Sequence, residues 1–164
     1  MDKVALIKQI EESFKDAVRP HVFVRKSFAH RSDWEVQWFS DKPLLTVDQY
    51  GYVEALEWRS GWRYMTPEAF VYLLPKNLVL SLDFAEPDIL EELVPVLSPS
   101  SFDPYSKWLE EVAGKLSADN LSTLIAYFDL VNADCPYAVG VDIGSTIRYW
   151  QEAYCSRCIS VDIT

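Results

Sequence analysis

The apolar stretch at residues 65–84, MTPEAFVYLLPKNLVLSLDF, constrains the fold of this chain more than any other segment. It opens with a helix-start signal, because Thr66 suits the N-cap position and Pro67 the first helical position. The apolar residues that follow recur at helical spacing on most sides, so other parts of the chain must cover them. We therefore expect a central helix over residues 66–83.

Pro75 lies in the middle of this predicted helix. Proline lacks an N–H, and its ring clashes with the carbonyl four residues earlier, here that of Val71, so we expect a kink or a break. Phe70, Leu74 and Leu78 are spaced four residues apart on one face, and we expect them in the core.

The whole chain, residues 1–164, has the length and periodicity of one mainly α domain, a bundle of about seven helices. It contains only five glycines, which argues against a turn-rich β-barrel. Residues 21–30 are expected to be extended or irregular. The segments with helical patterns are residues 2–17, 32–40, 46–58, 66–83, 86–97, 104–116, 118–131 and 145–155.

Several of these segments carry signals at their ends. Gln49 lies three residues after Thr46, a spacing that fits a capping box at the start of a helix. The pair Ser60–Gly61 predicts the end of that helix. Ser117 and Ser145 suit the N-cap positions of the last two helices.

The net charge of −10 is unevenly distributed. Residues 83–111 contain eight Asp and Glu against one lysine, a net charge of −7. Such a segment disfavours nucleic acid as a partner, and it can steer a basic protein partner, although the commoner role of such an acidic surface is only to keep a protein soluble. The candidate partner-binding residues in this segment are Glu91, Glu92, Glu110 and Glu111.

The N-terminal segment, MDKVALIKQIEESF, mixes charged with apolar residues, which indicates an amphipathic helix rather than a signal peptide. No apolar run is long and uninterrupted enough to span a bilayer. The three cysteines are an odd number without the spacing of a disulfide framework. These features predict a cytoplasmic protein in a reducing compartment, without membrane contact.

Residues 139–146, VGVDIGST, resemble the first phosphate loop of the sugar-kinase, actin and heat-shock-ATPase superfamily. The resemblance implies a role for Asp142 through a metal-bound water. It further implies phosphate contacts for Gly144, Ser145 and Thr146. That superfamily places the loop in the first hairpin of a large domain, whereas only 18 residues follow Thr146 here. We therefore interpret the segment as a turn leading into a serine helix cap, and expect no cofactor.

Cys155 and Cys158 form a single CxxC pair. A structural zinc site needs four ligands, and His21, His30 and Cys135 do not form a second spaced pair, so we expect no metal site. A redox-active CxxC is expected at the start of a helix, whereas this one lies at the end of the predicted last helix. We interpret it as two thiols at a frayed helix end, with a disulfide on oxidation as the alternative.

Aromatic residues are dense, and two tryptophan pairs have the i, i+4 spacing of one helix face. Core packing is the commonest role of such pairs, whereas a cluster around a cavity would form a binding site. The residues that would line such an aromatic pocket are Trp34, Trp38, Trp58, Trp62 and Tyr64.

One pattern extends over most of the chain and consists of Arg19–Pro20, Trp58, residues 65–70 (MTPEAF), residues 72–75 (YLLP), Leu82 and Tyr149–Trp150. It is similar to the pattern of an uncharacterised bacterial domain-of-unknown-function family with a Pro-Glu-Ala-Phe…Leu-Pro core block. The resemblance implies packing positions but no catalytic residues.

Two functions follow as hypotheses. The first is a non-enzymatic protein-binding domain whose acidic surface meets a basic partner, of which an immunity-type inhibitor is one example. The second is a small-molecule-binding or hydrolytic protein with the aromatic-lined pocket. No nucleophile elbow or kinase motif set occurs, so we predict no catalytic residues and favour the first hypothesis.

Overall fold

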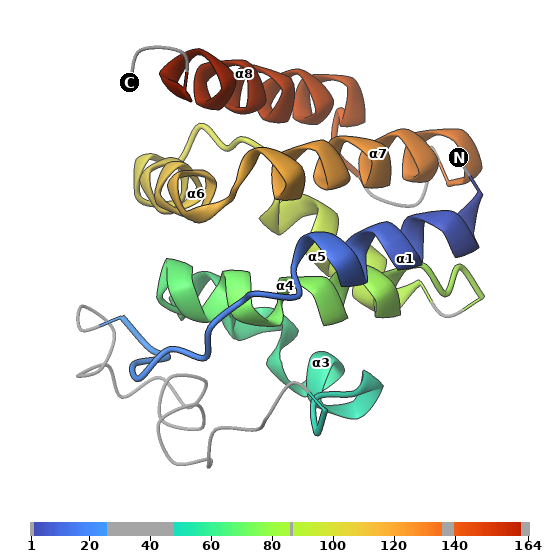
Figure 1. Cartoon of the computed structure of the whole chain (residues 1–164). Helices are drawn as coiled ribbons and strands as arrows, with labels where there is room; N and C mark the ends of the chain where they lie inside the picture. The colour runs from blue at the N-terminus through green and yellow to red at the C-terminus, as the bar shows by residue number, and fades with distance from the viewer. Residues whose placement is uncertain (1, 26–47, 86, 136–139, 162–164) are drawn as a thin grey trace.

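The computed structural model describes residues 2–25, 48–85, 87–135 and 140–161, and this part of the chain is mainly helical (Figure 1). The predicted all-α fold is therefore confirmed, and within the described residues the only β pairing is an isolated bridge between Val24 and Met65. The α-helices are α1 (Lys3–Ser13), α3 (Tyr52–Trp58), α4 (Pro67–Ser81), α5 (Asp88–Val96), α6 (Asp103–Lys115), α7 (Ala118–Asp134) and α8 (Ile143–Val161), and a 3₁₀-helix, η1, spans Arg59–Tyr64.

Helix α4 is the central element, as predicted, because it packs against α1, α5 and α6. Thr66 is its N-cap, and the Thr66 hydroxyl oxygen accepts a hydrogen bond from the Ala69 N–H at 3.2 Å. Phe70, Leu74 and Leu78 are fully buried, which confirms their predicted place in the core.

The predicted break at Pro75 is absent, because α4 continues through this residue without interruption. A proline inside a helix removes one backbone hydrogen bond. Here the helix is held by tertiary packing, since Leu73, Leu74 and Leu78 around the proline have no exposed surface. A kink at Pro75 stays a prediction.

The helices form a stack in which α8 and α7 lie side by side at one end and α3 lies at the other (Figure 1). Helix α1 lies between α7 and α4 and contacts both. Two buried indoles tie separate parts of the stack together. The Trp108 N–H donates to the Met65 carbonyl at 2.9 Å, and the Trp150 N–H donates to the Leu97 carbonyl at 3.0 Å.

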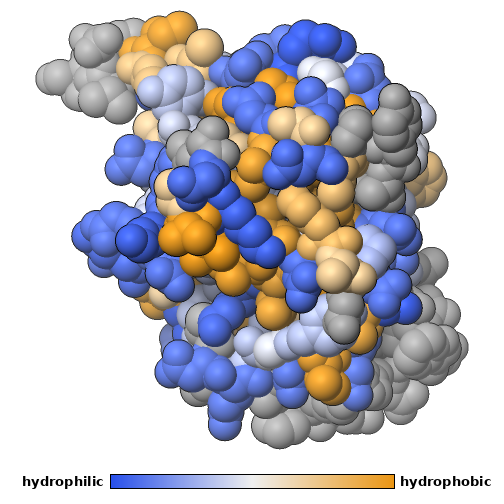
Figure 2. Space-filling model, turned by 90° about the vertical axis from the view of Figure 1, so that its right-hand side faces the viewer, coloured by the Kyte–Doolittle hydropathy of each residue, from blue (hydrophilic) through white to orange (hydrophobic). Residues whose placement is uncertain are grey.

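Hydrophobic residues gather in a band with hydrophilic residues around it on the face in Figure 2. That side of the molecule carries the first turn of α1 and the segment after α4 (Figure 1). There Lys3 Nζ lies 5.8 Å from the centre of the Phe84 ring, and the Val4 side chain is 64% exposed. Helix α1 therefore buries only one of its faces.

The early helix boundaries differ from the predicted ones. Helix α1 ends at Ser13 rather than at residue 17. Helix α3 begins at Tyr52 instead of residue 46, and the Glu54 carboxylate accepts a hydrogen bond from the Gly51 N–H at 2.9 Å. The predicted end of this helix is confirmed, because α3 ends at Trp58; the 3₁₀-helix η1, which contains Ser60 and Gly61, follows it directly. The predicted helix at residues 32–40 lies outside the described residues.

Of the later helices, α7 begins where the sequence predicted, whereas α8 does not. Ser117 is the N-cap of α7 as predicted, and its hydroxyl oxygen accepts a hydrogen bond from the Asn120 N–H at 3.1 Å. Helix α8 is longer than expected at both ends, since it begins at Ile143 and ends at Val161. Among the helices described, none is both long and apolar enough to cross a membrane.

Candidate functional site

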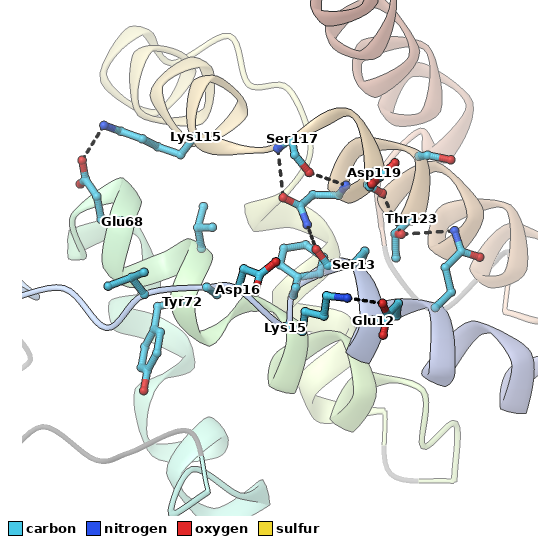
Figure 3. A pocket seen from close by; sticks show the side chains of 17 residues that line it. Glu12, Ser13, Lys15, Asp16, Glu68, Tyr72, Lys115, Ser117, Asp119 and Thr123 are labelled. Atoms are coloured by element: carbon cyan, nitrogen blue, oxygen red, sulfur yellow. Dashed lines mark hydrogen bonds and ion pairs between the residues drawn. The ribbon is translucent and has the colours of Figure 1, made fainter.

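A polar groove of about 760 Å³ lies between the end of α1, the first half of α4 and the α6–α7 corner (Figure 3). Polar and apolar side chains line it together, with Tyr72 and Val71 on the α4 side and Phe14 on the α1 side. Its charged lining residues are Glu12, Lys15, Asp16, Glu68, Lys115 and Asp119.

Asn120 fixes the inner wall of the groove. Its side-chain oxygen accepts from the Ser117 N–H at 3.0 Å, and its amide nitrogen donates to the Ser13 carbonyl at 2.6 Å. The capping interaction of α7 is thereby joined to the end of α1. One turn further, the Gln9 amide donates to the Thr123 hydroxyl at 3.2 Å (Figure 3). These four side chains of the wall, Gln9, Ser117, Asn120 and Thr123, are therefore paired within the protein.

Both lysines of the groove are already paired. Lys15 forms an ion pair with Glu12 within one turn of chain. Lys115, at the end of α6, forms an ion pair with Glu68, at the start of α4, at 2.7 Å. The Lys115 ammonium holds the pKa of the Glu68 carboxyl below its usual value, and Glu68 in turn raises the pKa of Lys115.

Two carboxylates, those of Asp16 and Asp119, form no hydrogen bond or ion pair with any residue that the structure describes. The four acidic residues of the groove outnumber its two lysines, so the groove has an excess of negative charge. Asp119 lies in the first turn of α7, where the helix dipole stabilises a carboxylate. The groove can therefore accept cationic groups without displacing an internal ion pair.

The Glu68–Lys115 pair predicts a pH dependence. Because its folded-state pKa is lowered, Glu68 contributes stability that is fully present above its ordinary value of 4.5 and is lost as the pH falls through the folded-state value. Both side chains are 49% exposed, so the contribution is at most about 1 kcal/mol. In an NMR titration of the Glu68 carboxyl, Lys115→Gln should raise the pKa of Glu68, whereas Lys8→Gln on the exposed face of α1 should not. Identical titration curves in both variants would contradict the ion pair.

The four glutamates predicted to bind a partner are all exposed, but they have different surroundings. Glu91 and Glu92 lie on α5. Glu111 lies on α6 near the groove, where it adds to the rise in the pKa of Lys115 caused mainly by Glu68. Glu110 faces α8: burial raises the pKa of Tyr149 to about 12, and the Glu110 carboxylate adds to that shift.

The residues predicted to line an aromatic pocket are not gathered at the groove. Trp58 and Trp62 are 2% and 0% exposed and belong to the core, and Tyr64 is half-buried at the end of η1. None of these three lines the groove. Trp34 and Trp38 lie outside the described residues.

The segment that resembles a phosphate loop begins helix α8. Asp142, not Ser145 as predicted, caps the helix, since an Asp142 carboxylate oxygen accepts from the Ser145 N–H at 3.2 Å. The Ser145 hydroxyl and N–H lower the pKa of Asp142. Thr146 is buried, and its hydroxyl donates to the Ser98 hydroxyl at 2.8 Å. The Asp142 and Ser145 groups are thus paired within the first turn of α8, and Thr146 is paired with a distant part of the chain.

The three cysteines are free thiols. Cys135 follows the last residue of α7, whereas Cys155 and Cys158 lie inside the last turns of α8 rather than at a frayed end. Among the described residues there is no group of three or more Cys, His, Asp and Glu side chains that could hold a metal ion.

The groove itself was missed by sequence reasoning, because its charged residues come from three segments far apart in the chain. Only the Ser117-x-x-Asn120 spacing at its wall is a recognisable local signal. Comparisons with protein-family models, curated proteins and solved structures found no match for this chain.

Proposed function

We propose that the protein is a non-enzymatic binding protein whose groove receives a basic segment of a protein partner. The observation that carries this proposal is the pair of carboxylates, Asp16 and Asp119, that have no hydrogen-bond or ion-pair partner among the described residues, in a groove whose two lysines are already paired. A lysine or arginine side chain of a partner would gain a counter-ion there. The proposal also includes that the chain is related to the uncharacterised bacterial family it resembles and that it is located in the cytoplasm.

The acidic surface outside the groove supports a second step, the approach of the partner. Exposed charge pairs contribute little energy each, about 0–1 kcal/mol. Their summed field instead raises the association rate, and salt screens it over about 8 Å at physiological ionic strength. We therefore assign the acceleration of association to four exposed glutamates, Glu91, Glu92, Glu110 and Glu111. The groove is assigned to the contacts that keep the bound partner from dissociating.

The small-molecule alternative has less support from the geometry. Trp58 and Trp62 are packed in the core, so they do not provide the aromatic walls that such a pocket requires.

The test is a comparison of two double variants of equal charge change. A basic partner captured from native cytosol at low salt is purified, and its association and dissociation rates are measured. Asp16→Asn with Asp119→Asn should weaken binding about tenfold, mainly through faster dissociation. Asp129→Asn with Glu152→Gln, at exposed sites away from the groove, should leave the dissociation rate unchanged.

Steering is tested separately by reversing Glu91, Glu92, Glu110 and Glu111 to lysine. Association should slow more than dissociation quickens, and the difference should shrink as salt is added. If no basic partner is captured, or if binding is indifferent to salt and to both sets of changes, the proposal fails.

A further inference from the structure

The thiols of Cys155 and Cys158 lie three residues apart on α8, so they share one helix face. Cys155 is exposed and Cys158 half-buried. Tyr154 neighbours the pair, because the Cys158 thiol, with a smaller contribution from Cys155, raises the pKa of the Tyr154 hydroxyl. The two sulfur atoms therefore lie on the same side of the helix, within reach of one small ligand.

The spacing of the pair does not suit a disulfide. Side chains three apart on a helix have Cβ atoms about 5–6 Å apart, whereas a disulfide needs about 3.5–4.5 Å. Closing that bond would require the two Cβ atoms to approach each other and would distort the helix around Arg157. Arg157 opposes this, because its guanidinium donates to the Ala113 and Gly114 carbonyls at the end of α6, at 3.2 and 2.8 Å.

The same spacing does suit a bridging metal ion. With metal–sulfur bonds of about 2.3 Å, two sulfurs on one ion are roughly 3.8 Å apart at a tetrahedral angle and roughly 4.6 Å apart in a linear arrangement. Either distance can be reached from Cβ atoms 5–6 Å apart without unwinding the helix. The described residues offer no further Cys, His or carboxylate ligand here, which excludes a four-ligand zinc site among them.

We propose that Cys155 and Cys158 form a two-thiolate site for a soft monovalent cation of the Cu⁺ class. Thiolate ligands select such ions over harder ones, and two ligands suffice for linear coordination. On binding, each thiol loses its proton and forms one sulfur–metal bond, so two protons are released and no electron is transferred. The site is separate from the groove, which neither cysteine lines.

The probe is Cu⁺ itself, added under anaerobic conditions against a coloured competing chelator. The full chain should bind one ion per molecule, with two sulfur neighbours by X-ray absorption and with unchanged helical circular dichroism. Cys155→Ser and Cys158→Ser should each weaken binding by at least about 100-fold, because a second thiolate in the same chain acts at high effective concentration. Cys135→Ser, which removes the thiol at the end of α7, is the matched control and should bind normally.

Three results would overturn the assignment. The first is binding by either serine variant that equals that of the unsubstituted chain. The second is one ion bridging two protein molecules, since the site would then not lie within one helix. The third is the ready formation of a Cys155–Cys158 disulfide by diamide with full retention of helicity, because the distance argument would then be wrong.

Discussion

Replacement of Trp108 by alanine should lower the free energy of unfolding by about 3–5 kcal/mol. The Trp108 side chain is 1% exposed, so its removal leaves a large cavity between α6 and α4. Its ring packs edge-on against Phe70, with ring centroids 4.9 Å apart, and its N–H donates to the Met65 carbonyl at 2.9 Å. Both interactions are lost together with the buried area.

A second variant separates these contributions. Trp108→Phe keeps most of the ring contact with Phe70 but removes the indole donor to the Met65 carbonyl, so it should cost less, about 1–3 kcal/mol. Urea unfolding followed by circular dichroism measures both. Equal destabilisation by the two variants would show that the hydrogen bond dominates and that the packing contribution is misjudged.

Replacement of Leu74 by alanine should cost about 2–5 kcal/mol. Leu74 has no exposed surface and lies in the middle of α4, between Phe70 and Leu78 on the face that the other helices cover. The surrounding side chains belong to several helices, so they cannot all move into the space that a removed isobutyl group leaves.

The matched control for Leu74→Ala is Val4→Ala, because Val4 is an apolar helix residue that is 64% exposed. That change removes little buried surface and introduces a better helix former, so unfolding should shift by less than about 0.5 kcal/mol. A shift below half a kcal/mol for Leu74→Ala itself would remove this residue from the core.

The interior of the helices could be predicted because their burial follows a regular period. In α7 four of the periodic residues, Leu121, Leu124, Phe128 and Val131, are buried and the fifth, Ile125, is half-buried, and Ser117 caps the helix as its position suggested. Such a signal is local, since every residue that defines it lies within one or two turns of the next.

The helix ends were harder to predict because several residues near an end can serve as a cap. Asp142 and Ser145 are both good N-cap residues, and the sequence alone does not decide between them. In the structure Asp142 is the N-cap of α8. The helix therefore begins about one turn earlier than predicted, and the Thr146 hydroxyl in this first turn donates to the Ser98 hydroxyl. The position of this helix start is thus linked to a hydrogen bond between residues 48 positions apart, which the local sequence does not reveal.

The groove could not be predicted for a related reason. Glu68 and Lys115 pair across helices that no local pattern relates, and Asp16 lines the groove only because α1 packs between α7 and α4. The acidic segment at residues 83–111, conspicuous in the sequence, contributes none of the groove's lining residues. Charge that is clustered along a chain need not be the charge that is gathered in space.

The packing of α1 against α7 has a consequence during synthesis of the chain, because α1 is made well before the helix that covers it. Ser13 and Asn120 are hydrogen-bonded although 107 residues separate them. At a synthesis rate of about 5–20 residues per second, α1 leaves the ribosome about 5–20 s before the start of α7 follows it. Helix α4 is made earlier and can cover one side of α1, but the side that faces α7 has no partner during that interval. Gln9 and Ser13, whose partners in the finished protein are Thr123 and Asn120, lie on this side, which a ribosome-associated chaperone therefore has the longest time to meet.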